Sequence, residues 1–483
     1  MPLILPGNVA SATAGAYEVA NSCRFDGSSA FLNKAQTSGS RTTNTISVWV
    51  KRSGLGSPIQ DIYSACAANI PSGNPDDNLW FNTTDTLEFA FYGDGSSGDN
   101  NGTLRTNRLF RDTSAWYHIV AVYDTTNATS GDRLRLYING VRETSFASET
   151  YPAQDTESGG MNNSSITLYL GQRGNSAQYF NGYMAEFCFI DGQALDPTSF
   201  GEFDEDSPRI WKPKDVSGLT FGDNGFYLDF EDSSNLGNDA NGGTDFTETN
   251  LAATDQTTDT PTNNFCTLNS LDSYWESSTF SEGNCKIVTE STDYSYNTST
   301  IGLTAGKWYC EVYIETTPHS TTKDSMLGIA GRMSEASQGY LGLYADTYGI
   351  YGGGGQFYNN GSSSSYGVSH TTGDIIGIYL DLDNNKLYFA KNGTIMNSGT
   401  GKAISAASAT TAGAYFMVAA DFYNGASGTY RVNFGNPIYS LSSANADANG
   451  YGSFEYDPSS GTFDGSSKDF YAICTKNLAE FGG

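Results

Sequence analysis

Tyrosine and asparagine side chains that could bind a sugar are concentrated between residues 340 and 366. The candidate ligand-binding residues are Tyr344, Tyr348, Tyr351, Tyr358, Asn359 and Asn360. A tyrosine ring can stack on the C–H face of a pyranose at a small entropic cost, and an asparagine amide can bond sugar hydroxyls. About half of these tyrosines must point into a core if the run forms strands. The run therefore predicts a carbohydrate site, and a purely structural cluster is the alternative.

A second group of oxygen-bearing side chains could hold a metal ion. Asp94, Asp99 and Asn101 lie in the segment GDGSSGDNNG and could supply ligands to a structural calcium ion. A glycine-rich loop without metal is the alternative. Residues 381–385 begin like a calcium-binding loop but lack its glycine and its final glutamate, so they predict a turn. We expect no other cofactor.

The three histidines give no sign of catalysis. His118 lies in a strand-like segment, and His319 and His370 lie in loop-like segments. In the sequence, none has a neighbouring nucleophile, a carboxylate dyad or the HExxH spacing of a metalloprotease. We therefore expect a protein that is not an enzyme.

Two hairpin-like segments position the rest of the chain. In residues 133–138, leucine and isoleucine alternate with arginine and tyrosine, which predicts a strand with one buried face and one solvent-exposed face. In residues 375–391, an apolar run, a polar turn and a second alternating run predict another hairpin. Each ends in Asn-Gly, a pair that favours a type I′ turn. Two such cores imply two β-sandwiches.

The composition agrees with an all-β fold. The 483 residues include 55 glycines and are rich in serine, threonine, asparagine and tyrosine, which favours strands and turns. We find no stretch of ten residues with convincing helical periodicity. The expected fold class is all-β, with two antiparallel jelly-roll-type sandwiches joined by a polar linker.

The charge excludes several classes of partner. There are 25 Lys and Arg against 53 Asp and Glu, a net charge of −28. Nucleic acid binding needs clustered positive charge, so we expect no nucleic acid partner.

No run approaches the roughly 18 apolar residues of a membrane span. The segment MPLILPGNVASATA lacks the basic residues and the apolar length of a signal peptide.

The cysteines indicate a reducing compartment. All are scattered singly, and several lie in apolar strand-like runs. They are Cys23, Cys66, Cys188, Cys266, Cys285, Cys310 and Cys474. An odd number without ligand-like spacing predicts buried, reduced thiols in a protein that folds in a cytosol.

Changes in composition predict five segments. They are an N-terminal arm (1–17), a first sandwich (18–200), a linker or strap (201–264), a second sandwich (265–440) and a C-terminal segment that packs back (441–483). Residues 231–264 carry few apolar side chains, which is typical of a linker or an extended strap. The arm contains Pro2 and Pro6, which favour an extended chain that can add as a strand to a neighbouring protein.

Several phrases of the sequence resemble known families. WYHIVAVYD, LRLYINGV and GYMAEFCFIDGQAL resemble the laminin-G-like branch of the concanavalin A-like superfamily. GKWYCEVYIE, GDIIGIYLDLDNNKLYFAKNG and VNFG resemble a SPRY domain. The pair, opened by MPLILPGN, joined by FYLDF and DTPTNNF and closed by ICTKNL, is similar to virion structural proteins of tailed bacteriophages.

The concanavalin A-like superfamily includes glycoside hydrolases with carboxylates in an E-x-D-x-(x)-E pattern. The closest segment here, residues 202–206, lacks the final glutamate at the right spacing and follows the sandwich strands. We interpret it as a solvated loop. Glu186 and Asp191 lie in the closing strand, where we expect structural roles.

The resemblance implies a non-enzymatic virion protein, assembled in the host cytoplasm, that displays lectin-like domains as a fibre, tail appendage or head decoration. The expected partners are capsid or tail proteins, further copies of the same chain and a host cell-surface glycan. Two alternatives stay open: a polysaccharide depolymerase of the virion, and a capsid-stabilising decoration without a ligand.

Overall fold

The computed structural model describes residues 17–66, 76–93, 101–174, 177–275, 278–290, 294–333, 339–422 and 425–482. Residues 1–16 of the predicted arm and the candidate ligands Asp94 and Asp99 lie outside these ranges. The described chain divides into two compact units. One comprises residues 17–111 and 115–262, and the other comprises residues 263–482 with 112–114.

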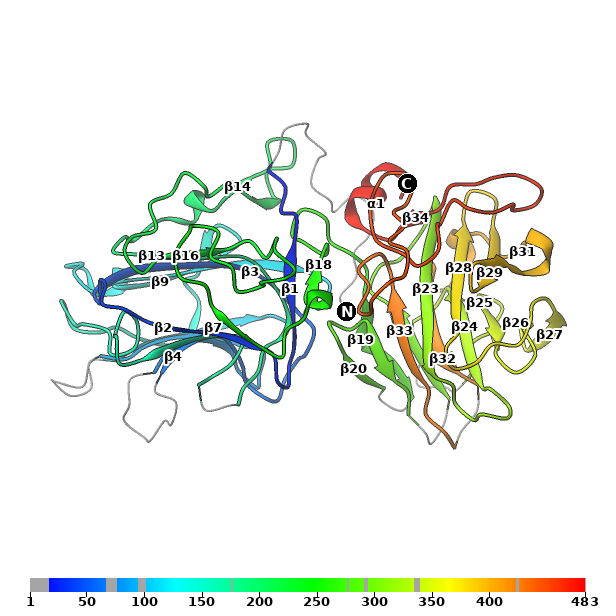
Figure 1. Ribbon diagram of the computed structural model, residues 1–483, viewed down its shortest axis with the longest axis horizontal. Helices are drawn as coiled ribbons and strands as arrows, with labels where there is room; N and C mark the ends of the chain where they lie inside the picture. The colour runs from blue at the N-terminus through cyan, green and yellow to red at the C-terminus, as the bar shows by residue number, and fades with distance from the viewer. Residues whose placement is uncertain are drawn as a thin grey trace. The chain divides into compact units, whose positions relative to one another are not determined.

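The first unit consists of two antiparallel sheets stacked face to face (Figure 1). One sheet has the strand order β10-β9-β8-β3-β13-β1-β18, and β16 also pairs with β13. Its strands are β1 (Ser22–Asp26), β3 (Thr43–Arg52), β8 (Trp116–Asp124), β9 (Leu134–Ile138), β10 (Val141–Arg142), β13 (Asn181–Asp191), β16 (Phe226–Leu228) and β18 (Gln256–Thr257).

The other sheet of this unit has the order β11-β7-β6-β5-β4-β12-β2-β17. Its strands are β2 (Phe31–Ala35), β4 (Gln60–Cys66), β5 (Asp76–Phe81), β6 (Thr86–Phe91), β7 (Gly102–Leu109), β11 (Phe146–Thr150), β12 (Thr167–Leu170) and β17 (Thr247–Thr249). Short 3-10 helices, η1 (Ser130–Asp132), η2 (Pro197–Ser199) and η3 (Ala253–Asp255), occur in the connections.

The alternating pattern of β9 places its apolar residues in the core between the sheets. Leu134, Leu136 and Ile138 belong to that core. The prediction that the opposite face is solvent-exposed is wrong at Tyr137. This residue is buried in a second cluster with Phe200, Val216 and Phe221. The outer face of this sheet is therefore covered by residues that follow the sandwich strands.

Residues 201–262 form a strap that belongs to the first unit. The hairpin of β14 (Gly201–Phe203) and β15 (Trp211–Pro213) precedes β16, β17 and β18, which extend the two sheets. Phe226, Leu228 and Phe246 anchor the strap in the main core. The few apolar residues of this polar segment are sufficient because strand pairing satisfies its backbone.

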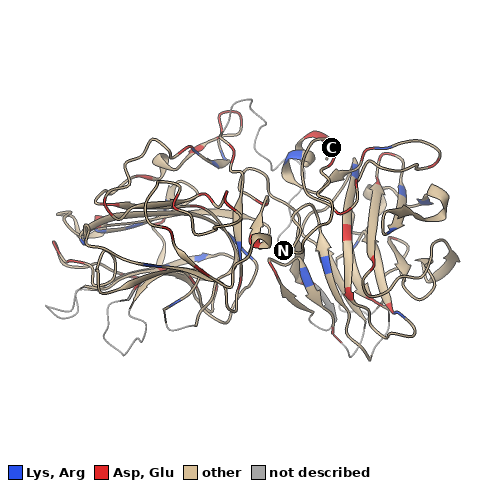
Figure 2. Ribbon diagram, in the orientation of Figure 1, with Lys and Arg blue, Asp and Glu red and all other residues tan. Residues whose placement is uncertain are grey.

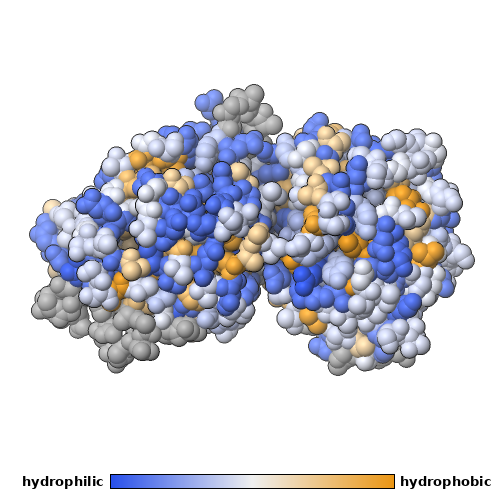
Figure 3. Space-filling view, viewed as in Figure 1, coloured by the Kyte–Doolittle hydropathy of each residue, from blue (hydrophilic) through white to orange (hydrophobic). Residues whose placement is uncertain are grey.

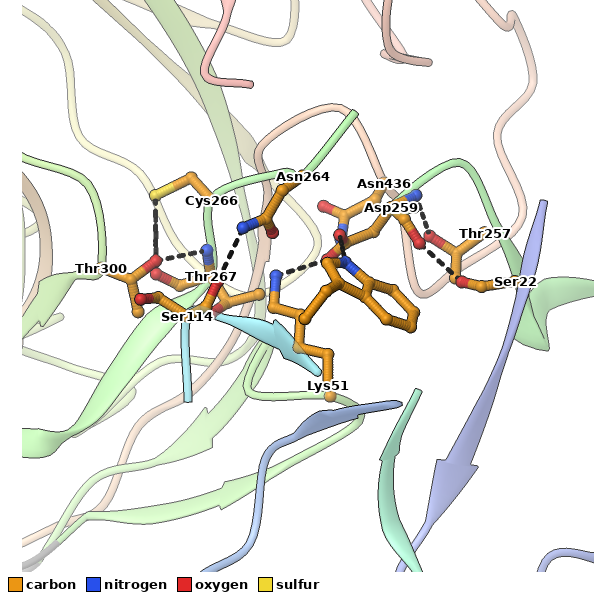
Figure 4. Close-up of polar contacts among 12 residues, drawn as sticks. Ser22, Lys51, Ser114, Thr257, Asp259, Asn264, Cys266, Thr267, Thr300 and Asn436 are labelled. Atoms are coloured by element: carbon orange, nitrogen blue, oxygen red, sulfur yellow. Dashed lines mark hydrogen bonds and ion pairs between the residues drawn. The ribbon is translucent and has the colours of Figure 1, made fainter. Parts of the chain in front are cut away.

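Polar contacts fix the end of the strap (Figure 4). The Ser22 hydroxyl donates to the Asp259 carbonyl at 2.6 Å, and the Asp259 N–H donates to Thr257 Oγ1 at 3.1 Å. Trp116 Nε1 donates to Asp259 Oδ1 at 3.1 Å, and the side chain of Asp259 is buried. Strands β1 and β8 are thereby joined to the strap inside one unit.

The second unit is also a sandwich of two antiparallel sheets. The first has the order β19-β22-β32-β24-β25-β26-β27. Its strands are β19 (Leu268–Trp275), β22 (Ser295–Ser299), β24 (Ser325–Ala330), β25 (Thr347–Tyr351), β26 (Gln356–Asn359), β27 (Ser362–Ser365) and β32 (Phe416–Asp421).

The other sheet of the second unit has the order β20-β21-β33-β23-β28-β29-β30, with β31 paired to β29 and β34 paired to β23. Its strands are β20 (Thr279–Ser281), β21 (Lys286–Val288), β23 (Lys307–Thr316), β28 (Ile375–Asp381), β29 (Lys386–Lys391), β30 (Thr394–Ile395), β31 (Lys402–Ala403), β33 (Thr429–Asn433) and β34 (Tyr471–Ala472). The remaining elements are η4 (Met396–Gly399), η5 (Ala407–Ala409) and the helix α1 (Thr475–Phe481).

The C-terminal segment (red in Figure 1) covers the outer face of this second sheet. Phe463 and Phe470 pack on Tyr379 and Tyr388, and Phe454 packs on Tyr309. Strand β34 runs parallel to β23, and Phe265 forms an isolated bridge with Cys474. The predicted hairpin of residues 375–391 is present, and both of its faces are buried.

Residues 340–344, at the start of the tyrosine-rich run, form a turn and not a strand. Gly342 has φ +97°, and Thr347 Oγ1 accepts the N–H groups of Gly342 and Tyr344 at 3.0 and 3.1 Å. These contacts close a turn, and the strand β25 begins only at Thr347. A hydroxyl that bonds nearby backbone groups competes with strand pairing.

The surface agrees with the acidic composition. In the ribbon of Figure 2, acidic and basic residues are scattered over both units. In the view of Figure 3, the surface of each unit is mainly hydrophilic, and apolar side chains form small separate groups. No helix among the described residues is long and apolar enough to cross a membrane.

Candidate functional site

Five aromatic side chains meet on the outer face of the sheet that contains β24 and β25. They are Tyr294, Tyr340, Tyr351, Tyr358 and Phe422, and we call them the aromatic platform. Phe422 is its centre, with ring centroids 4.6 Å from Tyr340, 5.1 Å from Tyr351, 5.2 Å from Tyr358 and 6.4 Å from Tyr294. Such distances are typical of packed aromatic pairs.

The period-2 geometry of strands explains why these rings share one face. In β25 and β26, Tyr348, Ile350 and Phe357 point into the core, so Tyr351 and Tyr358 point outward. Tyr358 pairs with Gly349 across the two strands. A side chain at Gly349 would come within 2.9 Å of Met326 Sδ, so glycine leaves the space that lets the neighbouring side chains pack closely.

The platform has an apolar base and a partly exposed top. Tyr340, Tyr351, Tyr358 and Phe422 are half-buried and pack on a buried layer beneath them. That layer consists of Tyr296, Met326, Ala330, Leu341, Val418 and Ala420. The hydroxyls of Tyr340 and Tyr358 have no hydrogen-bond partner among the described residues. The platform thus offers ring surfaces together with hydroxyl groups.

A buried carboxylate holds one ring of the platform in place. The Tyr351 hydroxyl donates to Asp324 Oδ1 at 2.6 Å, and Asp324 Oδ2 lies 2.8 Å from His319 Nδ1. The Phe422 N–H donates to the Asp324 carbonyl at 2.7 Å. Burial, followed by the bond to Asp324, raises the pKa of Tyr351 well above its ordinary value. Asp324 therefore fixes both Tyr351 and the backbone at Phe422.

The structure brings together only two of the six predicted sugar-binding residues, Tyr351 and Tyr358. Tyr348 is 3% exposed and lies in the core, where its hydroxyl bonds Ser405. Tyr344 lies apart from the platform, with its ring 4.0 Å from the Arg332 guanidinium. These two tyrosines are therefore not part of the platform.

The two predicted asparagines have structural contacts. Asn359 Nδ2 donates to the carbonyls of Ala345 and Thr347, each at 3.0 Å. Asn360 is exposed at the tip of the β26–β27 turn with φ +51°. Asparagine is one of the few residues that adopt this conformation readily. Both side chains shape the segment beside the platform.

Sequence reasoning missed Tyr294 and Phe422 as site residues, and it included Tyr340 in the tyrosine-rich run without selecting it as a ligand. One signal was available for Phe422, because it continues the alternation of Val418 and Ala420 on the outer face of β32. Nothing in the local sequence indicates that Tyr294 and Tyr340 reach the same face, since the sheet order places them there.

The candidate metal ligands do not form a described site. Asn101 Oδ1 accepts the Gly93 N–H at 3.1 Å. Within the described ranges, no group of three or more His, Cys, Asp or Glu side chains could hold a metal ion. Residues 381–385 form a turn in which Asp381 bonds Asn384 and Lys468, while Asp383 bonds Lys307.

His118 has the wrong tautomer to activate a nucleophile. Trp211 Nε1 donates to His118 Nδ1 at 2.9 Å, and Ser47 Oγ lies 2.8 Å from His118 Nε2. An indole N–H only donates, so Nδ1 carries no proton and Nε2–H must face the serine. A general base would have to accept the serine proton at Nε2. The three side chains are buried and form a structural network.

The carboxylates of residues 202–206 also have structural roles. Glu202 is exposed in β14. Asp204 is buried, which corrects the expectation of a solvated loop, and it accepts the N–H groups of Asp206 and Ser207 at 3.1 and 2.8 Å. Lys212 Nζ lies 3.5 Å from the same carboxylate. Asp191 is likewise buried and accepts the Ser40 N–H at 2.8 Å.

Comparisons with known proteins assign both sandwiches. Residues 26–198 match the concanavalin A-like lectin/glucanases superfamily, and residues 307–437 match the SPRY domain family. The chain therefore contains a concanavalin A-like domain followed by a SPRY domain, and the predicted all-β fold class is confirmed. Domains of these kinds fit a carbohydrate-binding or adhesion role.

Solved structures show weaker likeness. The human HERC1 SPRY domain is 17% identical, with a TM-score of 0.29, over 34% of this chain and 96% of that chain. A heptameric SAP-like pentraxin from Limulus polyphemus is 17% identical, with a TM-score of 0.27, over 37% of this chain and 80% of its own. Stonustoxin is 20% identical, with a TM-score of 0.26, over 35% and 27% respectively.

Proposed function

We propose that this protein is a non-enzymatic structural protein of a tailed-phage virion and that its SPRY domain binds a host cell-surface glycan through the aromatic platform. The observation that carries the glycan-binding part is the packing of four rings around Phe422 on a partly exposed sheet face. The virion part is supported by the resemblance of the opening, joining and closing phrases of the sequence.

The platform suits an uncharged sugar. Its rings offer surfaces for pyranose C–H groups, and the Tyr340 and Tyr358 hydroxyls can exchange hydrogen bonds with sugar hydroxyls. The carboxylate that bonds the platform, Asp324, is buried. A chain with a net charge of −28 repels acidic polysaccharides at long range, so neutral glycans are favoured.

Calorimetric titration with neutral and acidic oligosaccharides from the host surface tests the glycan proposal. Tyr358→Ala should weaken binding of the neutral sugar about tenfold, which corresponds to about 1.4 kcal/mol. Tyr313→Ala is a matched control, because Tyr313 is a half-buried tyrosine of β23 on the other sheet whose ring packs at a tilt against Tyr439. Equal binding by both variants would contradict the platform as the site.

Two further measurements separate the alternative functions. Release of reducing ends from host polysaccharide would make the protein a depolymerase. Absence of binding to every host glycan would leave a capsid-stabilising decoration. Cryo-electron microscopy of purified phage particles tests the virion proposal, and we expect density for both sandwiches on the particle surface.

A further inference from the structure

Three oxygen atoms form a closed triangle on the first unit. The Tyr17 hydroxyl oxygen lies 2.9 Å from Glu186 Oε2, and the Tyr227 hydroxyl oxygen lies 2.8 Å from the same atom. The two hydroxyl oxygens are 3.1 Å apart. All three separations are hydrogen-bond distances.

A β-bulge directs Glu186 into this triangle. The pairing of β13 with β3 shifts between Ala185 and Cys188, and Glu186 has φ +50°. Met184 and Phe187 both lie in the core, although three positions separate them. The extra residue of the bulge therefore turns Glu186 to the outer face. Such bulges commonly re-aim a side chain near a functional site.

Counting protons shows what the triangle requires. Each of the three contacts needs one hydrogen between its two oxygens. The two tyrosines supply two hydrogens, and a carboxylate supplies none. With an ionised Glu186, both hydroxyls would donate to Oε2 and their lone pairs would face each other at 3.1 Å. A protonated carboxyl supplies the third hydrogen and closes the ring.

We propose that Glu186 binds a proton in the native protein at neutral pH and that this proton closes a ring of hydrogen bonds that holds Tyr17 on the first sandwich. Glu186 is 6% exposed. The charged and titratable groups around the triangle are Asp229 and Glu231 after β16, Asp215 in the strap and Cys188 on β13. The three carboxylates disfavour a further negative charge, whereas the buried Cys188 thiol is neutral.

The electrostatic environment agrees with this geometry. Burial raises the pKa of Glu186 to about 7 against the hydrogen bonds from Tyr227 and Tyr17, which lower it, and the nearby carboxylates Asp229 and Glu231 add to the increase. The proton is therefore bound below about pH 7 and lost above it. Tyr227 belongs to β16 and is held by strand pairing, whereas Tyr17 lies outside any strand. Loss of the proton thus loosens Tyr17, where residues 1–16 join the sandwich.

Infrared difference spectroscopy of the full chain tests the proton directly. We expect the difference between the unmodified protein and Glu186→Gln to show the C=O band of a protonated carboxyl at pH 6 that disappears on titration to pH 8, because Glu311 and Asp421 contribute equally to both proteins. Tyr17→Phe is the decisive variant. This variant lacks the Tyr17 hydroxyl oxygen, so only the contact between Tyr227 and Glu186 is left. The Tyr227 proton fills that contact when Glu186 is ionised, so the carboxyl no longer needs a proton of its own. The titration midpoint should fall by about one unit.

The opposite result would overturn the proposal. If both tyrosines merely donate to an ionised carboxylate, removing one of them must raise the midpoint. Tyr227→Phe provides the same test at the second hydroxyl. Tyr151→Phe is the matched control, because Tyr151 donates to the exposed Glu149 at 3.3 Å in the same sandwich. It should leave the midpoint unchanged.

Amide hydrogen exchange tests the consequence for the chain. After correction for the intrinsic pH dependence, exchange at residues 17–19 should be several-fold faster at pH 8 than at pH 6 in the unmodified protein. Glu186→Gln keeps a neutral group in the ring and should remove this difference. Equal exchange at the two pH values in the unmodified protein would contradict the release of Tyr17.

Discussion

The carboxylate of Glu311 accepts the backbone N–H of Tyr456 at 2.8 Å and so joins β23 to the C-terminal segment. The same side chain accepts the Glu455 N–H at 3.0 Å, the Tyr309 hydroxyl at 3.0 Å and the Asn433 amide at 3.2 Å. Four donors converge on one buried carboxylate. A segment with little secondary structure is thereby fixed to a central strand.

Glu311→Gln should destabilise the second unit by about 1–3 kcal/mol, because the new amide N–H₂ would face a donor. Burial raises the pKa of Glu311 to about 7, whereas the unfolded chain binds this proton near pH 4.3. The folded state therefore holds more protons in between. The resulting stability is complete below about pH 4.3 and is lost as pH rises through 7.

Urea unfolding between pH 4 and 8 measures both effects. The unmodified protein should lose up to about 1.4 kcal/mol per pH unit from this group within that window, and Glu311→Gln should lack this contribution. Glu480→Gln, at an exposed carboxyl of the same unit, should behave like the unmodified protein. A pH dependence that survives in Glu311→Gln must come from another group, such as Asp421, whose pKa burial also raises to about 7.

A buried ion pair should dominate the stability of the strap. Lys51 Nζ lies 2.7 Å from Asp259 Oδ2, and both side chains are at most 1% exposed. Asp259→Asn leaves the lysine charge buried without its partner, which costs about 3–5 kcal/mol. Asp132→Asn breaks the exposed pair of Asp132 with Arg142 and should cost less than about 1 kcal/mol. Similar losses in urea unfolding of the two variants would contradict this assignment.

The buried imidazole of His118 should make the first unit sensitive to acid. Burial lowers the pKa of His118 to about 3, whereas an unfolded histidine titrates near pH 6.5. The unfolded chain therefore holds more protons between these values, and the stability from neutral His118 is lost as pH falls through this window. Glu186 has the opposite effect: its contribution to folding stability falls as pH rises above about 4.5.

A comparison with His118→Gln isolates the imidazole. The stability difference between the unmodified protein and the variant should shrink by up to about 1.4 kcal/mol per pH unit as pH falls from 6 to 4. A difference that is constant over this range, measured by chemical unfolding, would show that His118 does not control the acid response.

All seven cysteines should be free thiols that react only after unfolding. Each is buried, and no disulfide joins them. Burial raises the pKa of the Cys23, Cys188 and Cys310 thiols well above the ordinary value, so little thiolate is present. A thiol reagent should modify none quickly in the native protein and seven in denaturant. A stoichiometric disulfide found by mass spectrometry would refute this.

The strongly patterned hairpins could be predicted from the sequence, because their side chains decide their conformation locally. Residues 134–138 form β9, within the strand expected at residues 133–138, and Asn139 and Asn392 adopt the positive φ values of type I′ turns. Strand β22 could not be predicted. Its sequence SYNTS is polar yet buried throughout, because neighbouring strands satisfy its backbone.

The site was less predictable than the fold. The tyrosine-rich run indicated the right surface, but period-2 alternation sends Tyr348 inward and Tyr351 outward, and a shift of one residue exchanges them. Phe422 joins them only because β24 pairs with both β25 and β32. Long-range strand order of this kind leaves no local trace in a single sequence.

The bridge between Phe265 and Cys474 has a consequence for how this architecture can spread. It places the start of the second unit beside the residue that precedes its last element, the helix α1. A domain whose two ends meet can be inserted into a surface loop of an unrelated protein without distorting its host. With α1 included, the second unit should therefore tolerate insertion into a surface loop of a carrier protein while its aromatic platform stays intact.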